Sequence, residues 1–360
     1  MKYLREFATR SEYNSFIEAT DDYPNVCLIN EDGGVAYNPP PQPLYIEAIE
    51  DLTVSFGNTY EYSKDNVTWT TGNSETAIPA STGEKVYFRA SSLTVNAGSI
   101  GNFAISNKCN VGGNIMSMLY GRNFANKTEI TKAYYFASIF SFCTNIIDAS
   151  KLLLPATTLT NYCYQGLFKG CTSLIGVPAL PATTLKAYCY GDMFRNCTSL
   201  MKAPELPATT LAGNCYDSMF YGCTSLVNAP ELPAKTLASA CYLEMFRGCS
   251  ALVGVSALPA TILERSCYRA MFYGCKSLST APELPATKLT TTCYYEMFNG
   301  CANLNYIKML ATDISASSCL GFWVSDVSAA GTFVKNSAAT WDKTGTSGVP
   351  SGWTVEYADA

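Results

Sequence analysis

Paired cysteines are the residues of this 360-residue chain whose type and spacing could do chemistry. They form two series whose members recur every 26 residues: Cys163, Cys189, Cys215, Cys241, Cys267 and Cys293 in the first, and Cys171, Cys197, Cys223, Cys249, Cys275 and Cys301 in the second. Thiols in such numbers could form disulfides, hold a metal ion or act as nucleophiles.

The spacing argues against these uses. Cys189 and Cys197 are eight residues apart on a segment where the pattern predicts a helical turn, which would separate their Cα atoms by about 12 Å. A disulfide spans at most roughly 7 Å between Cα atoms, although bridges between repeats stay open as an alternative. Zinc sites use closely spaced cysteines or histidines, and the chain has neither. We therefore expect no metal, no cofactor, and two columns of small buried side chains.

Common catalytic groups are also missing from the sequence. Without histidine, neither a Ser-His-Asp nor a Cys-His arrangement can form. Glu205, Glu231 and Glu283 occupy the same place in their repeats and could align as carboxylates, but Ala179 and Ala257 fill that place in other copies. We predict that the protein is not an enzyme and has no catalytic residues.

Composition narrows the class of partner. Charged residues make up only 15% of the chain, its net charge is −5, and no run of Lys and Arg is present, so we expect no nucleic-acid partner. No apolar segment approaches the roughly 18 residues of a membrane-spanning helix, so we expect no membrane insertion. Arg5 and Glu6 stand where an export signal needs an apolar core, and we expect no such signal.

The 26-residue repeat decides the expected architecture. Six full copies carry both cysteines, a weaker copy precedes them, and a decaying copy with Cys319 follows. In one copy the spacing of Cys189, Met193, Phe194 and Cys197 predicts a short helix or helical turn. Glycines at one place in most copies predict the end of that turn, and the residues after it predict an extended segment. Degenerate terminal copies are typical of a solenoid, whose end repeats face water on one side.

The phrases "MFYGCTSL" and "PELPATTL" carry a resemblance to a known family. Over residues 114–330 the chain resembles the Treponema-type leucine-rich repeats of BspA-like surface proteins, although its unit is longer and small or polar residues replace the usual Ile. The resemblance implies a curved solenoid used in adhesion or recognition. Separately, "YLREFATRSEYNSFIEATDDYPNVCLINEDGGVAYNP" resembles a leader module of Bacteroides proteins and of structural proteins of their phages.

Together these patterns predict a multidomain, mixed α/β chain. We expect a small αβ attachment module at residues 1–38, a Pro-rich linker at 39–43 and an Ig-like β-sandwich at 44–113. A leucine-rich-repeat solenoid at 114–330 and a C-terminal β cap at 331–360 would follow. The module at 1–38 is expected to contain a strand at 3–7, a helix to about residue 19 and a hairpin between 26 and 37.

Residues that vary between otherwise identical copies mark the expected partner-binding face, because side chains that differ from copy to copy are not needed to pack the core. We expect this face to recognise a bacterial surface glycan or protein. The alternative is that these positions vary by neutral drift and bind no partner. A column of tyrosines, one after each first cysteine, could pack between coils or form a contact surface. The face comprises Lys202, Glu205, Asn228, Glu231, Thr280, Glu283 and Tyr306.

The expected function is non-enzymatic recognition by a phage virion fibre or decoration protein that is made in the host cytoplasm. Its N-terminal module would contact other virion proteins, and fibres of this kind are expected to be homo-oligomers. A BspA-like adhesin on the bacterial cell surface is the alternative. A purely architectural virion protein is the second alternative.

Overall fold

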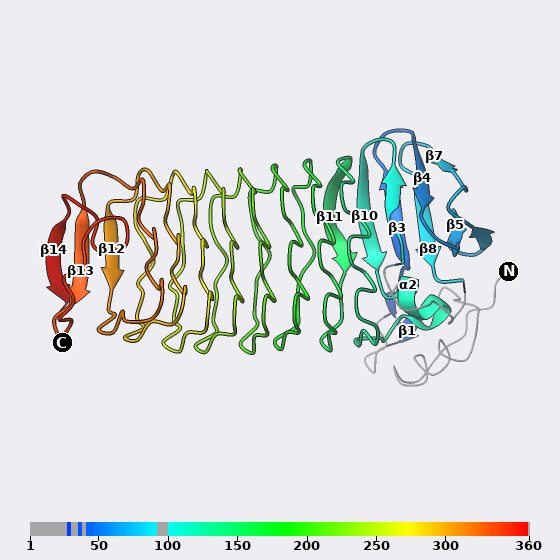
Figure 1. Cartoon of the computed structure of the whole chain (residues 1–360). Coiled ribbons are helices and arrows are strands. Elements are labelled where there is room, and N and C mark those ends of the chain that lie inside the picture. Colours follow the sequence, from blue (N-terminus) through cyan, green and yellow to red (C-terminus); the bar gives the residue numbers. More distant parts are fainter. Residues whose placement is uncertain (1–26, 30–34, 38–40, 92–99, 359–360) are drawn as a thin grey trace.

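The computed structural model describes residues 27–29, 35–37, 41–91 and 100–358. The body is elongated, with strands at the N-terminal end, a long stack of coils, and a small sheet at the C-terminal end (Figure 1). The strand expected at 3–7 and the helix expected up to residue 19 lie outside the described residues. Within the described part, the helical segments are α2 (Ser117–Tyr120) and η1 (Gly121–Asn123), so the chain is strands and turns with almost no helix.

The hairpin expected between residues 26 and 37 is confirmed. Strands β1 (Cys27–Ile29) and β2 (Val35–Tyr37) pair antiparallel, with Leu28 opposite Ala36.

Two sheets form the N-terminal end of the body. The larger has the order β11-β10-β3-β8-β5-β6 and the smaller β7-β4-β9. They pack through aromatic rings, since Phe88 of the larger sheet meets Phe103 of the smaller at 5.0 Å between ring centroids. Their strands are β3 (Leu44–Ala48), β4 (Leu52–Phe56), β5 (Tyr60–Ser63), β6 (Thr70–Gly72), β7 (Ile78–Ala80), β8 (Lys85–Arg89), β9 (Phe103–Ile105), β10 (Cys109–Asn114) and β11 (Ile146–Leu153).

The larger sheet continues into the stack of coils. The boundary expected between residues 113 and 114 falls inside β10, which pairs antiparallel with β3 and parallel with β11. Asp148 of β11 then bridges in parallel to Gly176 of the next coil. One buried core cluster runs without interruption from Leu44 to Trp353. The N-terminal strands therefore form a covering layer for the first coil.

Backbone hydrogen bonds between the turn segments of successive coils hold the coils together. The Tyr190 N–H donates to the carbonyl of Cys215 in the next coil at 3.0 Å, and the Phe194 N–H donates to that of Met219 at 2.9 Å. The residues between them donate within their own coil, as Met193 does to the Tyr190 carbonyl at 3.3 Å. Because N–H groups alternate between these two kinds of partner, this buried backbone is satisfied without a helix.

The helical turn predicted between Cys189 and Cys197 is wrong, and the described residues do not form the mixed α/β class that was expected. Tyr188, Asp192 and Asn196 have φ of 55°, 55° and 60°, so every fourth residue is left-handed and the segment is a chain of tight turns. The turn-ending position was predicted correctly, because glycine holds positive φ there without strain. In other copies that position is Gly170, Gly222, Gly248, Gly274 and Gly300.

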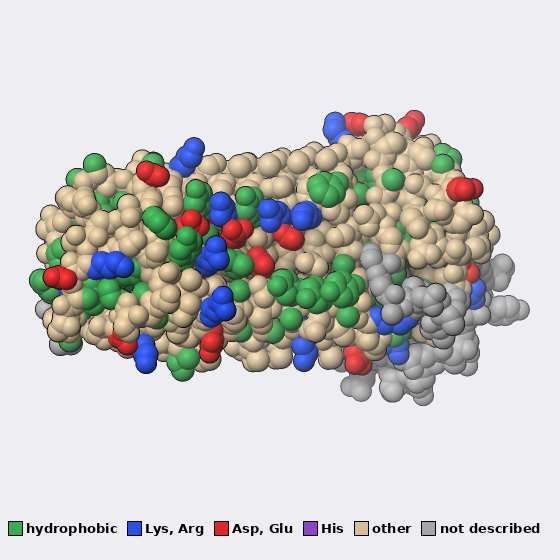
Figure 2. All heavy atoms as spheres, viewed as in Figure 1, with side chains coloured by type: hydrophobic (Ala, Val, Ile, Leu, Met, Phe, Trp, Pro, Cys, Tyr) green, Lys and Arg blue, Asp and Glu red, His purple; other side chains and the backbone are tan. Residues whose placement is uncertain are grey.

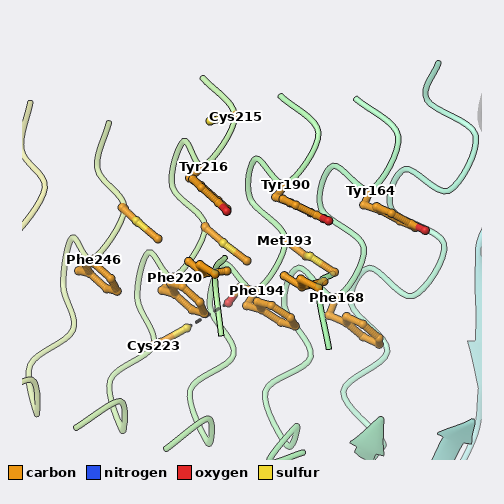
Figure 3. Packing of buried hydrophobic residues seen from close by; sticks show 14 of the residues in the cluster. Tyr164, Phe168, Tyr190, Met193, Phe194, Cys215, Tyr216, Phe220, Cys223 and Phe246 are labelled. Carbon is orange, nitrogen blue, oxygen red and sulfur yellow. Dashed lines mark hydrogen bonds between the residues drawn. The ribbon is translucent and has the colours of Figure 1, made fainter. Parts of the chain in front are cut away.

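Columns of identical side chains fill the interior of the stack (Figure 3). Phe194, Phe220 and Phe246 are fully buried and stack with ring centroids 5.7 and 5.6 Å apart. Tyr190 and Tyr216 stack in the same way at 5.9 Å. The tyrosine column expected from the sequence therefore packs between coils, and its exposed-surface alternative is wrong because these rings are at most 2% exposed.

A C-terminal sheet ends the stack. Strands β12 (Tyr306–Met309), β13 (Thr332–Asn336) and β14 (Thr354–Ala358) pair in parallel. Trp323 lies over the last rings of both aromatic columns, 6.3 Å from Tyr294 and 6.0 Å from Phe298. Its indole N–H donates to the Gly348 carbonyl at 2.8 Å. The columns thus end against a buried indole rather than water.

Replacing Tyr190 by phenylalanine is expected to raise the free energy of unfolding by about 1 kcal/mol, because the buried phenol oxygen has no hydrogen-bond partner. The chain itself uses Phe136 at the first position of this column, stacked on Tyr164 at 5.6 Å. Urea denaturation of the two proteins measures the change. A loss of stability above 1 kcal/mol would show that the hydroxyl does have a partner.

Candidate functional site

A groove hollows the face that carries the extended segments of the coils. One part, of about 700 Å³, is lined by residues of two consecutive coils, among them Met201, Lys202, Glu205, Asn228 and Glu231. An adjoining part of about 550 Å³ shares Lys202 and Glu205 and continues to the coil before. The two parts form one groove across three neighbouring coils, which we call the strand-face groove.

Four of the seven predicted partner-face residues lie together in this groove, and all four are exposed. Lys202 and Asn228 face each other across a parallel bridge between adjacent coils, which sets the groove floor. Asn228 in turn bridges to Gly254, where any Cβ would collide with the Asn228 amide oxygen. A glycine in the following coil therefore leaves room for this polar side chain.

The other three predicted residues lie further along the stack and do not line the groove. Thr280 bridges in parallel to Tyr306, at the start of the C-terminal sheet. Glu283 is paired with Lys308 at 3.1 Å. These residues belong to the same columns as the groove residues, but the Glu283 carboxylate is already engaged by Lys308.

The charged side chains of the groove lack ion-pair partners, unlike Glu283 further along the same column of carboxylates. Within the described residues, neither Glu205 nor Glu231 has an ion-pair partner, and Lys202 has none either. A carboxylate column next to a single amine gives the groove a weakly acidic character. Its charged groups are free to meet those of a partner.

An exposed apolar stripe follows the groove. Ile175, Met201, Val227 and Val253 hold the same place in four consecutive coils and are 51%, 62%, 39% and 54% exposed. Prolines flank them, among them Pro204 and Pro230. Large apolar side chains in a contiguous exposed row typically mark an interaction surface.

No feature of the thiols fits a nucleophile. The fifteen cysteines from Cys109 to Cys319 are free and buried, and burial raises the pKa of the Cys197 and Cys249 thiols to about 12. The second series makes a ladder of its own, in which Cys223 donates to the Phe194 carbonyl of the preceding coil at 3.1 Å (Figure 3). The predicted columns of small buried side chains are confirmed, and their S–H groups also link coils.

Side chains suited to metal binding do not gather in the described residues. There, no group of three or more Cys, Asp and Glu side chains could hold an ion. Nor is any helix of the described part long and apolar enough to cross a membrane.

A second surface was missed by the sequence analysis. At one position of five consecutive coils stand Lys169, Arg195, Tyr221, Arg247 and Tyr273, which we call the Arg–Tyr ladder. The Arg195 guanidinium lies 4.0 Å from the centroid of the Tyr221 ring, and that of Arg247 lies 4.1 Å from Tyr273. The shared 26-residue spacing of these five residues was the signal that could have revealed it.

Comparison with known proteins adds no assignment. No protein-family model, no curated protein and no solved structure matches this chain. The strand-face groove and the Arg–Tyr ladder must therefore be interpreted from their own geometry.

Proposed function

We propose that the stack is a leucine-rich-repeat solenoid of the BspA-like type and that the protein is a non-enzymatic recognition protein. Its strand-face groove would bind a molecule on the bacterial surface, either a glycan or a protein. The observation that carries this proposal is the groove itself, where Lys202, Glu205, Asn228 and Glu231 converge with unpaired charges beside an exposed apolar stripe.

The interior of the stack supports a scaffold role. The thiols of the repeats and the tyrosine column are buried, and histidine is absent from the sequence. Such side chains hold the coils in register while the variable positions remain on the outside. Repeat proteins generally bind partners on extended surfaces of this kind.

The proposed setting is a phage virion, in which the chain is a fibre or decoration protein attached to other virion proteins through residues 1–38 and assembled as a homo-oligomer. Free, buried thiols fit a protein that folds in a reducing host cytoplasm. The rival setting is an adhesin on the bacterial surface. Mass spectrometry of purified phage particles and of outer membranes from uninfected cells separates the two, because the virion proposal requires the chain in the particles.

A charge-reversal variant of the groove tests recognition directly. Glu205→Lys with Glu231→Lys is expected to reduce binding of the labelled protein to Bacteroides-group cells by about tenfold or more, since two groove carboxylates are lost. Glu264→Lys, an exposed carboxylate outside the groove, is the matched control and should bind as the unmodified protein does. Equal binding by all three proteins would contradict recognition through this groove and leave an architectural role.

A further inference from the structure

The Arg–Tyr ladder is built as a binding surface in its own right. Each guanidinium is fixed twice: Arg195 is paired with Asp192 at 3.2 Å and stacked on Tyr221, and Arg247 is paired with Glu244 at 2.9 Å and stacked on Tyr273. Only about three-tenths of either arginine side chain is exposed. Because both are held in one geometry before any partner arrives, binding would cost little side-chain entropy.

Hydrogen-bonding groups of the ladder remain unused after its internal ion pairs are made. A guanidinium has five N–H donors, and each ion pair uses an atom of only one end of it. Within the described residues, the phenol oxygens of Tyr221 and Tyr273 make no hydrogen bond, and both side chains are partly exposed. The ladder thus presents donors and acceptors that a hydroxyl-rich partner could satisfy.

Charge on the ladder is balanced rather than one-signed. Three cations, Lys169, Arg195 and Arg247, stand beside three carboxylates, Asp192, Asp217 and Glu244. Figure 2 shows basic and acidic side chains intermixed over the middle of the stack. A balanced surface gives no strong field to attract an anionic polymer, so it fits an uncharged partner better.

One carboxylate of this set, that of Asp217, is largely shielded from solvent. Burial raises the pKa of Asp217 to about 6, with further contributions from the neighbouring carboxylates Asp192 and Glu244. The Ser218 hydroxyl donates to it at 2.9 Å. A partly desolvated carboxylate beside the ladder would be a strong acceptor for a partner hydroxyl.

The period of the ladder indicates the repeat of its partner. The two arginines of the ladder stand two coils apart, and the acidic residues Asp192, Glu244 and Glu296 recur at the same two-coil interval. Equivalent rings of successive coils lie 5.6–5.9 Å apart on this side of the stack, so the two-coil period is roughly 11 Å. An extended disaccharide of β-linked hexoses has a comparable length. Proteins bind more apolar partners through exposed apolar anchors, and no large exposed apolar side chain belongs to the ladder.

We propose that the Arg–Tyr ladder binds a linear, uncharged polysaccharide that repeats every two sugars, with one disaccharide lying over each two coils. The sugar hydroxyls accept from the arginine N–H groups, donate to the carboxylates, and exchange hydrogen bonds with the Tyr221 and Tyr273 hydroxyls. No ladder residue lines the strand-face groove. The inference therefore does not depend on the function proposed for that groove.

Calorimetric titration of the full chain with cellohexaose, hexa-N-acetylchitohexaose and hyaluronan hexasaccharide tests this inference. At least one of the two neutral sugars is expected to bind, with an affinity that changes little between low and high salt. The variant Tyr221→Phe with Tyr273→Phe keeps both rings and their cation–π contacts. It should weaken that binding by about tenfold or more, because two hydrogen bonds to the sugar are lost.

Two controls separate this result from a structural effect and from the groove. Tyr357→Phe, on the exposed strand β14, should leave sugar binding unchanged. The two phenylalanine substitutions should weaken sugar binding by the same factor in a protein that also carries Glu205→Lys and Glu231→Lys in the groove. The inference is overturned if neither neutral sugar binds, if only hyaluronan binds and is released by salt, or if the double phenylalanine variant binds as tightly as the unmodified protein.

Discussion

Replacing Phe220 by alanine is expected to lower the free energy of unfolding by about 3–5 kcal/mol, the range for a buried aromatic side chain whose cavity cannot collapse. Phe220 is fully buried and stacks on Phe194 at 5.7 Å and on Phe246 at 5.6 Å. The backbone on both sides is fixed by hydrogen bonds between coils, such as Phe220 N–H to the Met245 carbonyl at 2.9 Å. The neighbouring rings therefore cannot move in to fill the space.

The exposed Phe142 provides the matched control for this experiment. Its side chain is 68% exposed, so Phe142→Ala should change the unfolding free energy by less than about 0.5 kcal/mol. Chemical denaturation followed by circular dichroism measures both variants. A loss below 1 kcal/mol for Phe220→Ala would contradict a continuous aromatic column.

Deleting residues 209–234, one whole 26-residue coil, is expected to leave a folded protein. The deletion keeps every column in register, and stability in a stacked repeat is approximately a sum over repeats and their interfaces. Deleting residues 209–221, half of that length, shifts the following coils by half a repeat. Turn segments of one coil then lie against extended segments of the next. This shift breaks the Phe, Tyr and Cys columns together, so we expect a loss well above that of a single buried aromatic, about 3–5 kcal/mol.

Thermal unfolding followed by circular dichroism compares the two deletions. The whole-coil deletion should retain one cooperative transition close to that of the full chain. The half-coil deletion should lose the transition or shift it far downward. Equal stability of the two proteins would mean that the copies fold without a common register.

The sequence predicted the columns of the stack well, because their period is visible without knowing the path of the chain. Cysteines, tyrosines and phenylalanines repeated every 26 residues must occupy equivalent places, and the structure buries them as expected. Glycines at one position likewise predicted a turn, and Gly222 and Gly248 have φ of 71° and 75°.

The turn segments were mistaken for helices because two periods are hard to separate over a short stretch. Side chains of the turn chain face inward every four residues, whereas those of a helix do so every 3.6. Over the nine residues from Cys189 to Cys197 the two patterns nearly coincide. The turn chain differs from a helix in the acceptor of each backbone N–H. Tyr190, for example, donates to a carbonyl of the next coil, and the sequence does not show that acceptor.

The sequence likewise predicted one candidate site in part and missed the other. Lys202, Glu205, Asn228 and Glu231 were predicted from variation between copies, and the structure brings them into one groove. Thr280, Glu283 and Tyr306 share their columns but do not line the groove, and position in a column alone does not show where the surface is hollowed. The Arg–Tyr ladder was missed because its contacts join residues one coil apart, which become neighbours only through stacking.

Thiol labelling with mass-spectrometric readout tests most directly the claim that successive copies form one stack around buried side chains. In the native protein the twelve cysteines of the two series should stay unlabelled, because they are buried and burial raises their thiol pKa. After unfolding without reductant, all sixteen cysteines of the chain should be labelled. Rapid labelling of the two series in the native protein, or fewer than sixteen labels after unfolding, would contradict the account.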